Sequence, residues 1–411
     1  MISGIKSGLW LVERRVCAVS LMMILATLIA FGWIVVTGHG TLDGLERPIG
    51  TDFSNVYAAG KMASDGHAAL AWNWPAHFAE QQALHHKANV NFYGWHYPPP
   101  FLLLATLLSF FPYLIALAVW QSTTLALCVG VLRQILPGRG TMLVGLGCPV
   151  VLVCLGHGHN GFLTGALLGG GLLLLERKPL IAGLLLGCLI YKPQFGLVLP
   201  VILLAGQHWR AIGGALISAL ILCGLTLLIW GWPVWHAFID SLPLTQSVII
   251  EQGSTGWEKI QSSFSAVRNW GGSIALAWQV QGIFTAIAVL GTAFVARGAS
   301  PANRNAVILA AALLSTPYIL DYDLVPLELG VAFLIEDGRT RGFLPMEKSL
   351  YAFVWMVPLV GRSWMSITSI PFGFIAILTI FMLALRRAVQ LDACTLSTAW
   401  PFRRSHGSFA P

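Results

Sequence analysis

The chain of 411 residues is 56% hydrophobic and only 10% charged, whereas charged residues make up about 25% of an average soluble domain. Apolar runs close to the ~20 residues that cross a bilayer recur along most of it. The composition excludes an ordinary soluble domain, and the long unbroken apolar runs exclude an alternating β-barrel. The sequence therefore predicts an all-α, polytopic membrane protein with one domain over residues 1–411.

The first apolar run starts this membrane topology. Three basic residues, Lys6, Arg14 and Arg15, precede an apolar run over about residues 17–36. The run is long for a signal peptide and has no convincing cleavage site after it. We interpret it as an uncleaved first helix with a cytoplasmic N-terminus.

The net charge of +7 follows from the same topology and does not indicate nucleic-acid binding. Basic residues collect at breaks between apolar runs, and such residues favour the cytoplasmic side. A basic cytoplasmic tail is expected over residues 386–411. Few Lys and Arg residues fall in loops that this topology places outside: Arg47, Lys61, Lys87, Lys192, Lys259, Arg268 and Arg362.

The apolar runs predict about 12 membrane spans, and 11 to 13 are compatible with the pattern. The stretch 98–136 is long for one crossing and has a break at Phe111-Pro112. Runs such as 179–191 and 324–335 are short for a full crossing, so we expect tilted or incomplete spans that line a cavity.

Two long polar loops face outward in this topology, at about 38–97 and 233–272. The first contains two segments of helical character, Phe53–Gly66 and Pro75–Ala88. We expect these two segments to form helices at the membrane interface, flanking a groove for the substrate.

Carboxylates at the edges of apolar spans are the first candidates for chemistry. Desolvation makes such groups costly unless they face a cavity, and Asp52, Asp321, Asp323 and Glu328 meet this condition best. The alternative for Asp52 and Asp321 is that each caps the helix that follows it.

Two other motifs carry polar groups to the outer side. His157-Gly158-His159-Asn160 has too few ligands for a metal site, but its imidazole and amide groups can bind a sugar or phosphate. A glycine turn in which Asn160 caps a helix explains it equally well. Lys192, before Pro193, is expensive near a membrane unless it snorkels or pairs with an anion such as a lipid phosphate.

The second outward loop combines hydrogen-bond donors, aromatic faces and a charge around Gln261-Ser262 and Arg268. Sugar sites use this mixture, although interfacial loops share it. The chain has no Gly-rich phosphate loop and no HExxH motif. These absences leave ATP-driven transport without support. No ligand cluster calls for a metal, although the sequence does not settle metal use, and no cofactor is expected.

Taken together, these motifs resemble glycosyltransferase family 87, a family of polyprenyl-phosphate-sugar-dependent enzymes with the GT-C fold that includes bacterial α-mannosyltransferases. The resemblance covers about residues 50–335. The motifs that carry it are Thr51-Asp52-Phe53, Tyr57-Ala58-Ala59-Gly60, Tyr97-Pro98-Pro99, Gly156-His157-Gly158-His159-Asn160, Lys192-Pro193, Trp209-Arg210, Gln261-Ser262, Ser315-Thr316-Pro317-Tyr318 and Tyr322-Asp323.

The resemblance implies a glycosyltransferase in the bacterial inner membrane whose active site faces the periplasm. It would transfer a hexose, with mannose expected, from a polyprenyl-phosphate donor to a lipid or glycan acceptor with inversion. Asp52 would be the general base, and Lys192 and Arg268 would bind the donor phosphate. The expected substrate-binding residues are Tyr57, His96, Tyr97, His157, His159, Asn160, Gln261, Ser262, Tyr322 and Asp323.

Two other functions stay open. Charged residues near short spans would also suit a transporter or flippase of a lipid-linked sugar, although no inverted repeat is visible. A non-catalytic assembly factor on the same scaffold is the third possibility. The sequence leaves the sugar, the acceptor, the polyprenol length and the oligomeric state undetermined.

Overall fold

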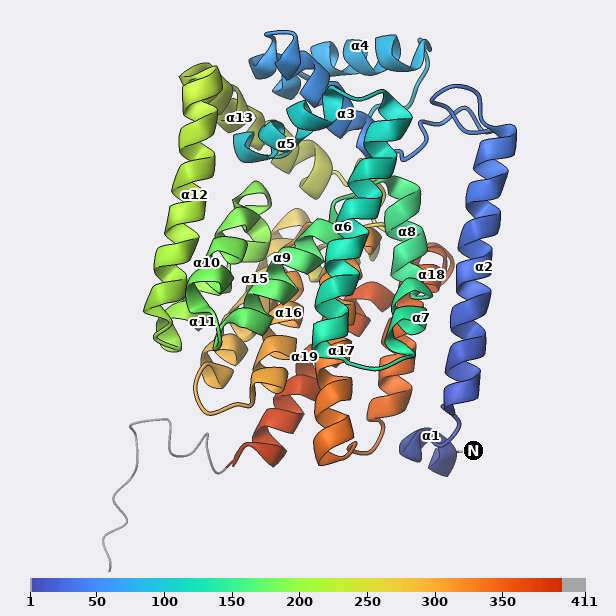
Figure 1. Cartoon of the computed structure of the whole chain (residues 1–411), viewed down its shortest axis with the longest axis vertical. Helices are drawn as coiled ribbons and strands as arrows, with labels where there is room; N and C mark the ends of the chain where they lie inside the picture. Colours follow the sequence, from blue (N-terminus) through green and yellow to red (C-terminus); the bar gives the residue numbers. More distant parts are fainter. Residues whose placement is uncertain (1, 394–411) are drawn as a thin grey trace, which may run out of the picture.

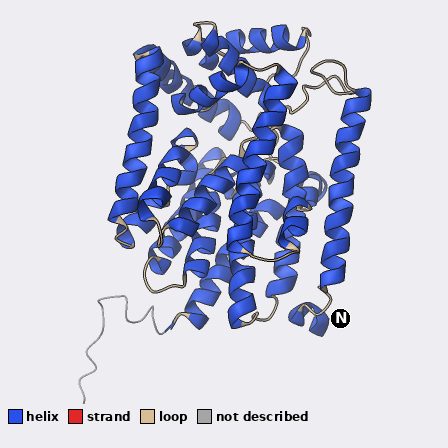
Figure 2. Ribbon diagram, viewed as in Figure 1, coloured by secondary structure: helices blue, strands red, loops and turns tan. Residues whose placement is uncertain are grey.

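A computed structural model describes residues 2–393 as one bundle of helices joined by short loops (Figures 1 and 2). Within this described part no strand occurs, and pairing of extended backbone is limited to isolated bridges. The all-α prediction is confirmed. The α-helices are α1 (Ile2–Ser7), α2 (Glu13–Thr37), α3 (Phe53–Ser64), α4 (Trp74–His85), α5 (Pro99–Ser109), α6 (Tyr113–Ile135), α7 (Thr141–Leu146), α8 (Pro149–His157), α9 (Gly161–Leu174), α10 (Pro179–Gly187), α11 (Leu199–Ala205), α12 (Trp209–Trp230), α13 (Trp232–Thr245), α14 (Ser263–Asn269), α15 (Ile274–Val295), α16 (Pro301–Leu314), α17 (Val325–Arg341), α18 (Glu347–Thr368) and α19 (Phe372–Leu391).

Short segments of tighter or wider helix connect these elements. Four are 3₁₀ turns, and one, η4, is a π-helical turn that continues α13. Their bounds are η1 (Ala68–Trp72), η2 (Cys188–Tyr191), η3 (Pro193–Gly196), η4 (Gln246–Glu251) and η5 (Asp321–Leu324).

Six helices of the described part are long and apolar enough to cross a membrane: α2, α6, α12, α15, α18 and α19. Shorter apolar helical segments occupy 99–109, 161–174, 179–191 and 193–205. Long and short apolar helices are therefore both present, whereas the incomplete crossing of the short ones and the total of about 12 spans stay predictions.

The predicted break at Phe111-Pro112 is confirmed, because α5 ends at Ser109 and α6 begins at Tyr113. Pro112 has no N–H to continue a helix and instead precedes the first residue of α6. The short apolar run at 324–335 is not among the six long apolar helices, and its role as a tilted or incomplete span stays a prediction. That run belongs to α17, which continues to Arg341, where Arg341 pairs with Asp337 one turn earlier.

The upper end of the bundle in Figure 1 carries α3, α4 and α13. The first two confirm the helical segments predicted in the first outward loop. The second outward stretch differs from its description as a loop, because α13, η4 and α14 occupy most of it. Pro233 in the first turn of α13 has the fixed φ that suits a helix start.

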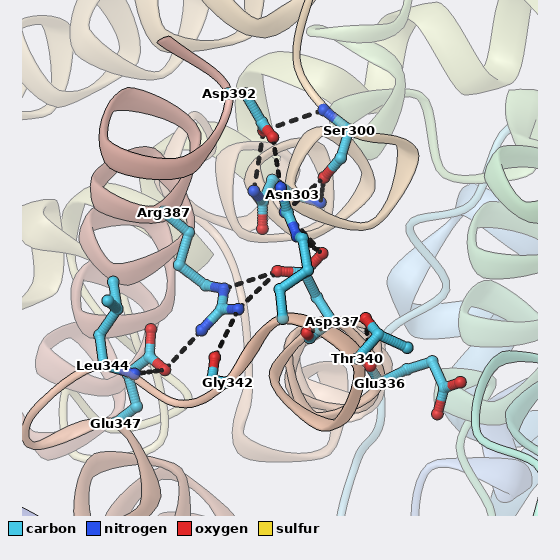
Figure 3. A network of polar contacts seen from close by, with 11 residues as sticks. Ser300, Asn303, Glu336, Asp337, Thr340, Gly342, Leu344, Glu347, Arg387 and Asp392 are labelled. Atoms are coloured by element: carbon cyan, nitrogen blue, oxygen red, sulfur yellow. Dashed lines mark hydrogen bonds and ion pairs between the residues drawn. The ribbon is translucent and has the colours of Figure 1, made fainter.

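The lower end of the bundle is held by a buried ion-pair network (Figure 3). Arg387 of α19 is fully buried and donates to Asp337 of α17 and to Glu347 of α18, with N–O distances of 2.6 Å in both ion pairs. A buried guanidinium needs such partners to offset its desolvation. The cytoplasmic tail expected from Arg386 stays a prediction. Its first residues continue α19 to Leu391, and residues 394–411 lie outside the described residues.

Candidate functional site

Polar residues from five separate segments meet where the starts of α3 and α9 adjoin η5. The turn from α8 to α9 makes this meeting possible. Gly158 in this turn has φ of +63°, and a Cβ added there would lie 2.7 Å from Cβ of Phe53 at the start of α3. Only glycine suits both the backbone conformation and this close approach.

Asp52 lies immediately before α3, beside the end of α8. Its backbone N–H donates to the carbonyl of His157 at 3.0 Å, and its Oδ2 lies 3.9 Å from Nδ1 of the same histidine. That Nδ1 is hydrogen-bonded to Oγ1 of Thr51 at 2.7 Å. The capping alternative is not supported, because the Asp52 carboxylate accepts no capping hydrogen bond from α3.

The Asp52 carboxyl has an ionisation suited to proton transfer near neutral pH. It belongs to the segment between α2 and α3, outside the six long apolar helices. Burial raises its pKa to about 6, although the Tyr322 side chain and the charge of Lys259 act in the opposite direction. A group with this pKa is mostly ionised at pH 7 and still basic enough to accept a proton.

Lys192 and Asp323 form the buried centre of the cluster. Nζ of Lys192 lies 2.5 Å from Oδ1 of Asp323 and 3.0 Å from Oδ1 of Asn160. The other oxygen of Asp323 accepts from the backbone N–H of Leu320 at 3.1 Å. Lys192 is only 4% exposed, so its charge is already balanced inside the protein.

His159 and two tyrosines form the aromatic wall of the cluster. The ring of His159 stacks on Tyr322 with centroids 3.7 Å apart, and its Nε2 is hydrogen-bonded to the Tyr97 hydroxyl at 3.0 Å. Burial lowers the pKa of His159 well below its ordinary value, so the ring is neutral at pH 7. Its Nδ1, which has no hydrogen-bond partner within the described part, lies 3.9 Å from Oδ1 of Asp323.

Two predicted sugar-binding residues, Tyr57 and His96, have structural partners elsewhere. The Tyr57 hydroxyl donates to the carbonyl of Phe111 at 2.8 Å. Nδ1 of His96 is hydrogen-bonded to Oγ1 of Thr245 in α13 at 3.0 Å. Both contacts tie the upper helices together, and the binding roles of these residues stay predictions.

The predicted residues of the second outward stretch shape their own backbone. The Gln261 amide donates to the carbonyls of Glu258 and Lys259, both at 3.0 Å. Ser262 caps α14 through a capping box. Arg268 donates to the carbonyl of Gly272 at 2.6 Å and lies over the Trp257 ring, 5.4 Å from its centroid.

Sequence reasoning did not assign two cations that the fold places beside the acidic cluster. Ile260, next to Lys259, forms a β-bridge with Leu320, which precedes Asp321. Arg362 lies on α18, which packs against both α8 and η5. Lys259 interacts electrostatically with Asp52, and Arg362 with Asp321 and His157. Within residues 2–393 neither cation has a carboxylate within 4.0 Å.

The sequence did contain a signal for these two residues. Both belong to the small set of basic residues that the topology places outside. A cation there works against the usual cytoplasmic bias, which is a reason to look for an anionic partner. Glu328, in contrast, lies away from this cluster and lines an apolar pocket between α6, α8 and α17.

Comparison with known families identifies the chain. The model of glycosyltransferase family 87 matches residues 95–317. The chain belongs to glycosyltransferase family 87. No curated protein and no solved structure matches it. The family makes this membrane-type helical protein a glycosyltransferase, which takes a sugar donor and an acceptor, and its all-α architecture is consistent with the GT-C type.

The family 87 match covers only part of the cluster. His157, His159 and Lys192 fall within it, whereas Asp52 precedes it and Asp323 follows it. The fold brings all of them together. Within the described residues no group of three or more His, Cys, Asp and Glu side chains is arranged to hold a metal, and the expectation that neither metal nor cofactor is used stays a prediction.

Proposed function

We propose that this family 87 glycosyltransferase transfers a hexose from a polyprenyl-phosphate donor to a lipid or glycan acceptor with inversion, and that Asp52 is its general base. The observation that carries the proposal is the state of Asp52. It has a pKa of about 6 and takes no part in capping α3. A carboxylate held in this way beside the imidazole of His157 has the protonation state that base catalysis needs.

The proposed reaction is a direct displacement at the anomeric carbon. Asp52 removes the proton of the acceptor hydroxyl while that oxygen forms a bond to the anomeric carbon. The bond from this carbon to the phosphate oxygen breaks through an oxocarbenium-like transition state, and the electron pair leaves with the polyprenyl phosphate. Phosphate is a good leaving group, so positioning and charge neutralisation supply the rest of the catalysis.

The negative charge that develops on the leaving phosphate needs cations at the site. Lys192 and Arg268 remain the residues predicted for this role. The balanced pair of Lys192 with Asp323 and the backbone contact of Arg268 favour other groups. We propose Lys259 and Arg362 as the main partners of the phosphate, because both have uncompensated charges near Asp52 and Asp321.

The proposed location is the bacterial inner membrane, with the site facing the periplasm and about 12 spans in a single domain. The separation of elements along the bundle supports this orientation. The helices α3, α4 and α13 lie at one end, and the basic N-terminal segment with the start of α18 lies at the other (Figure 1). Mannose is the first donor sugar to examine, and α3 and α4 are proposed as interfacial helices.

A direct assay tests the function. The purified full-length protein in lipid nanodiscs is incubated with lipid and glycan acceptors and a panel of polyprenyl-phosphate hexoses or nucleotide sugars. We expect hexose-extended product and free polyprenyl phosphate, detected by mass spectrometry, from a polyprenyl-phosphate donor only. Movement of a labelled donor across vesicles without any glycoside product would favour the flippase alternative.

The pKa of Asp52 predicts how the reaction depends on pH. Only the ionised carboxylate can accept the proton, so kcat/KM should rise with pH until the pH passes about 6. We expect kcat/KM at pH 5 to be roughly tenfold below its value at pH 8. Binding of the donor, measured at the same pH values, separates this effect from a change in affinity. A flat profile between these pH values would contradict the assignment.

A further inference from the structure

The helix α1 and the loop that joins α17 to α18 lie at the opposite end of the bundle from α3 and α4 (Figure 1). A pocket lies between them. Its volume is about 500 Å³. Two lysines from distant parts of the chain, Lys6 and Lys348, line it. The other lining residues are Ser7, Phe343, Leu344 and Pro345.

Hydrogen bonds hold α1 in place beside this pocket. The backbone N–H of Met346 donates to the carbonyl of Lys6 at 2.8 Å. The Ser349 hydroxyl donates to the carbonyl of Ile5 at 2.7 Å and accepts from the Trp10 indole at 2.8 Å. Met346 has φ of +75°, a costly conformation for a non-glycine residue. The two lysines are therefore brought to one pocket by a specific tertiary contact.

The carboxylates near the pocket are ion-paired inside the protein (Figure 3). Glu347, next to Lys348, pairs with Arg387 and also accepts from the backbone N–H of Leu344 at 2.7 Å. Asp337 pairs with the same arginine. Both carboxylates are therefore engaged with Arg387, and within the described residues neither forms an ion pair with Lys6 or Lys348.

Three cations surround the pocket without such partners. The ammonium of Lys348 lies 4.7 Å from the centroid of the Phe343 ring, and Arg386 donates to the carbonyl of Pro345 at 3.1 Å. Within the described part of the chain no carboxylate lies within 4.0 Å of Lys6, Lys348 or Arg386. The pocket is therefore suited to an anion.

The surroundings of the pocket indicate where that anion comes from. The segment between α1 and α2 exposes Leu9, Trp10 and Val12, and Leu9 is 76% exposed. Apolar side chains and a tryptophan at the start of a membrane helix are typical of the headgroup zone. A soluble phosphate would leave these side chains uncovered, whereas the acyl chains of a lipid would cover them.

We propose that this pocket binds the headgroup of an anionic phospholipid. The phosphate oxygens accept hydrogen bonds from the ammonium groups of Lys6 and Lys348, and the acyl chains cover the apolar segment that follows α1. Basic pockets between membrane helices recognise lipid headgroups in this way. The proposal does not depend on the sugar-transfer reaction.

Native mass spectrometry of the full-length protein in detergent tests the proposal. The protein is titrated with phosphatidylglycerol, with phosphatidylcholine and with inorganic phosphate. We expect phosphatidylglycerol alone to be retained, and the double variant Lys6→Gln/Lys348→Gln to weaken its apparent affinity at least about fivefold. The matched control removes two exposed charges between α9 and α10 (Arg177→Gln/Lys178→Gln), and it should bind like wild type.

Several outcomes would overturn the proposal. Equal weakening by both double variants would mean that binding depends on net charge alone. Equal retention of phosphatidylcholine by wild type would exclude charge recognition, and equal binding of inorganic phosphate would exclude a lipid as the specific ligand. If the glutamine variant does not fold, Lys6→Arg/Lys348→Arg is compared instead, and the wild-type selectivity between lipids decides the question.

Discussion

Replacing Asp52 by Asn should lower the rate of sugar transfer at least about 10²-fold, because asparagine has nearly the same shape but cannot accept the acceptor's proton. The protein should stay folded. The Asp52 carboxylate makes no capping hydrogen bond to α3, and burial disfavours its charged form. The measurement is product formation by the purified variant, together with its thermal unfolding midpoint.

A second carboxylate in the same region provides the control. Asp65 lies just after α3 and forms an exposed pair with Lys61, with 2.8 Å between Nζ and Oδ1. Asp65→Asn should leave both rate and stability within the range of wild type, since exposed ion pairs contribute little. Turnover by Asp52→Asn at more than half the wild-type rate would remove Asp52 as the base.

Replacing Lys192 by Met should destabilise the protein by about 3–5 kcal/mol, because the carboxylate of Asp323 would stay buried without a cation. Asp323 is only 2% exposed, so water cannot replace the ammonium. The double variant Lys192→Met/Asp323→Leu should recover most of the loss. The free energy of unfolding in mixed micelles measures both changes.

The control for this experiment is Lys61→Met, which removes the same side chain from an exposed pair. We expect it to cost less than about 1 kcal/mol. A stable Lys192→Met variant with a raised KM for the donor would contradict the expected result. That outcome would instead support the phosphate-binding role that the sequence predicts for Lys192.

The sequence predicts the class of the protein and much of its local structure. Composition and the length of apolar runs require membrane helices, because helices alone satisfy their backbone groups along such runs. Local propensity predicts the helices α3 and α4. It also predicts the break at Phe111-Pro112. The residue types that gather around Asp52 were also recognisable, since charged groups next to apolar spans are costly without a function.

The sequence did not predict which side chains pair when they lie far apart along the chain. Lys192 and Asp323 are 131 positions apart, and no local pattern says which carboxylate that lysine meets. The sequence predicts binding roles for Arg268 and Gln261 as it does for Lys192. Their side chains, however, hydrogen-bond to nearby backbone carbonyls. Lys259 was visible only as a basic residue in an outward loop, until the bridge from Ile260 to Leu320 placed it beside the acidic cluster.

Asp52 shows which properties follow from the sequence and which follow from the tertiary structure. The sequence by itself determined that a carboxylate stands where a membrane helix gives way to a polar segment, and that capping and catalysis were both possible. The tertiary structure removed the capping role, since Asp52 accepts no hydrogen bond from α3, and it placed His157 and Tyr322 next to the carboxylate. Burial by these distant segments is what raises its pKa, because desolvation depends on all the neighbours in space and not on those along the chain.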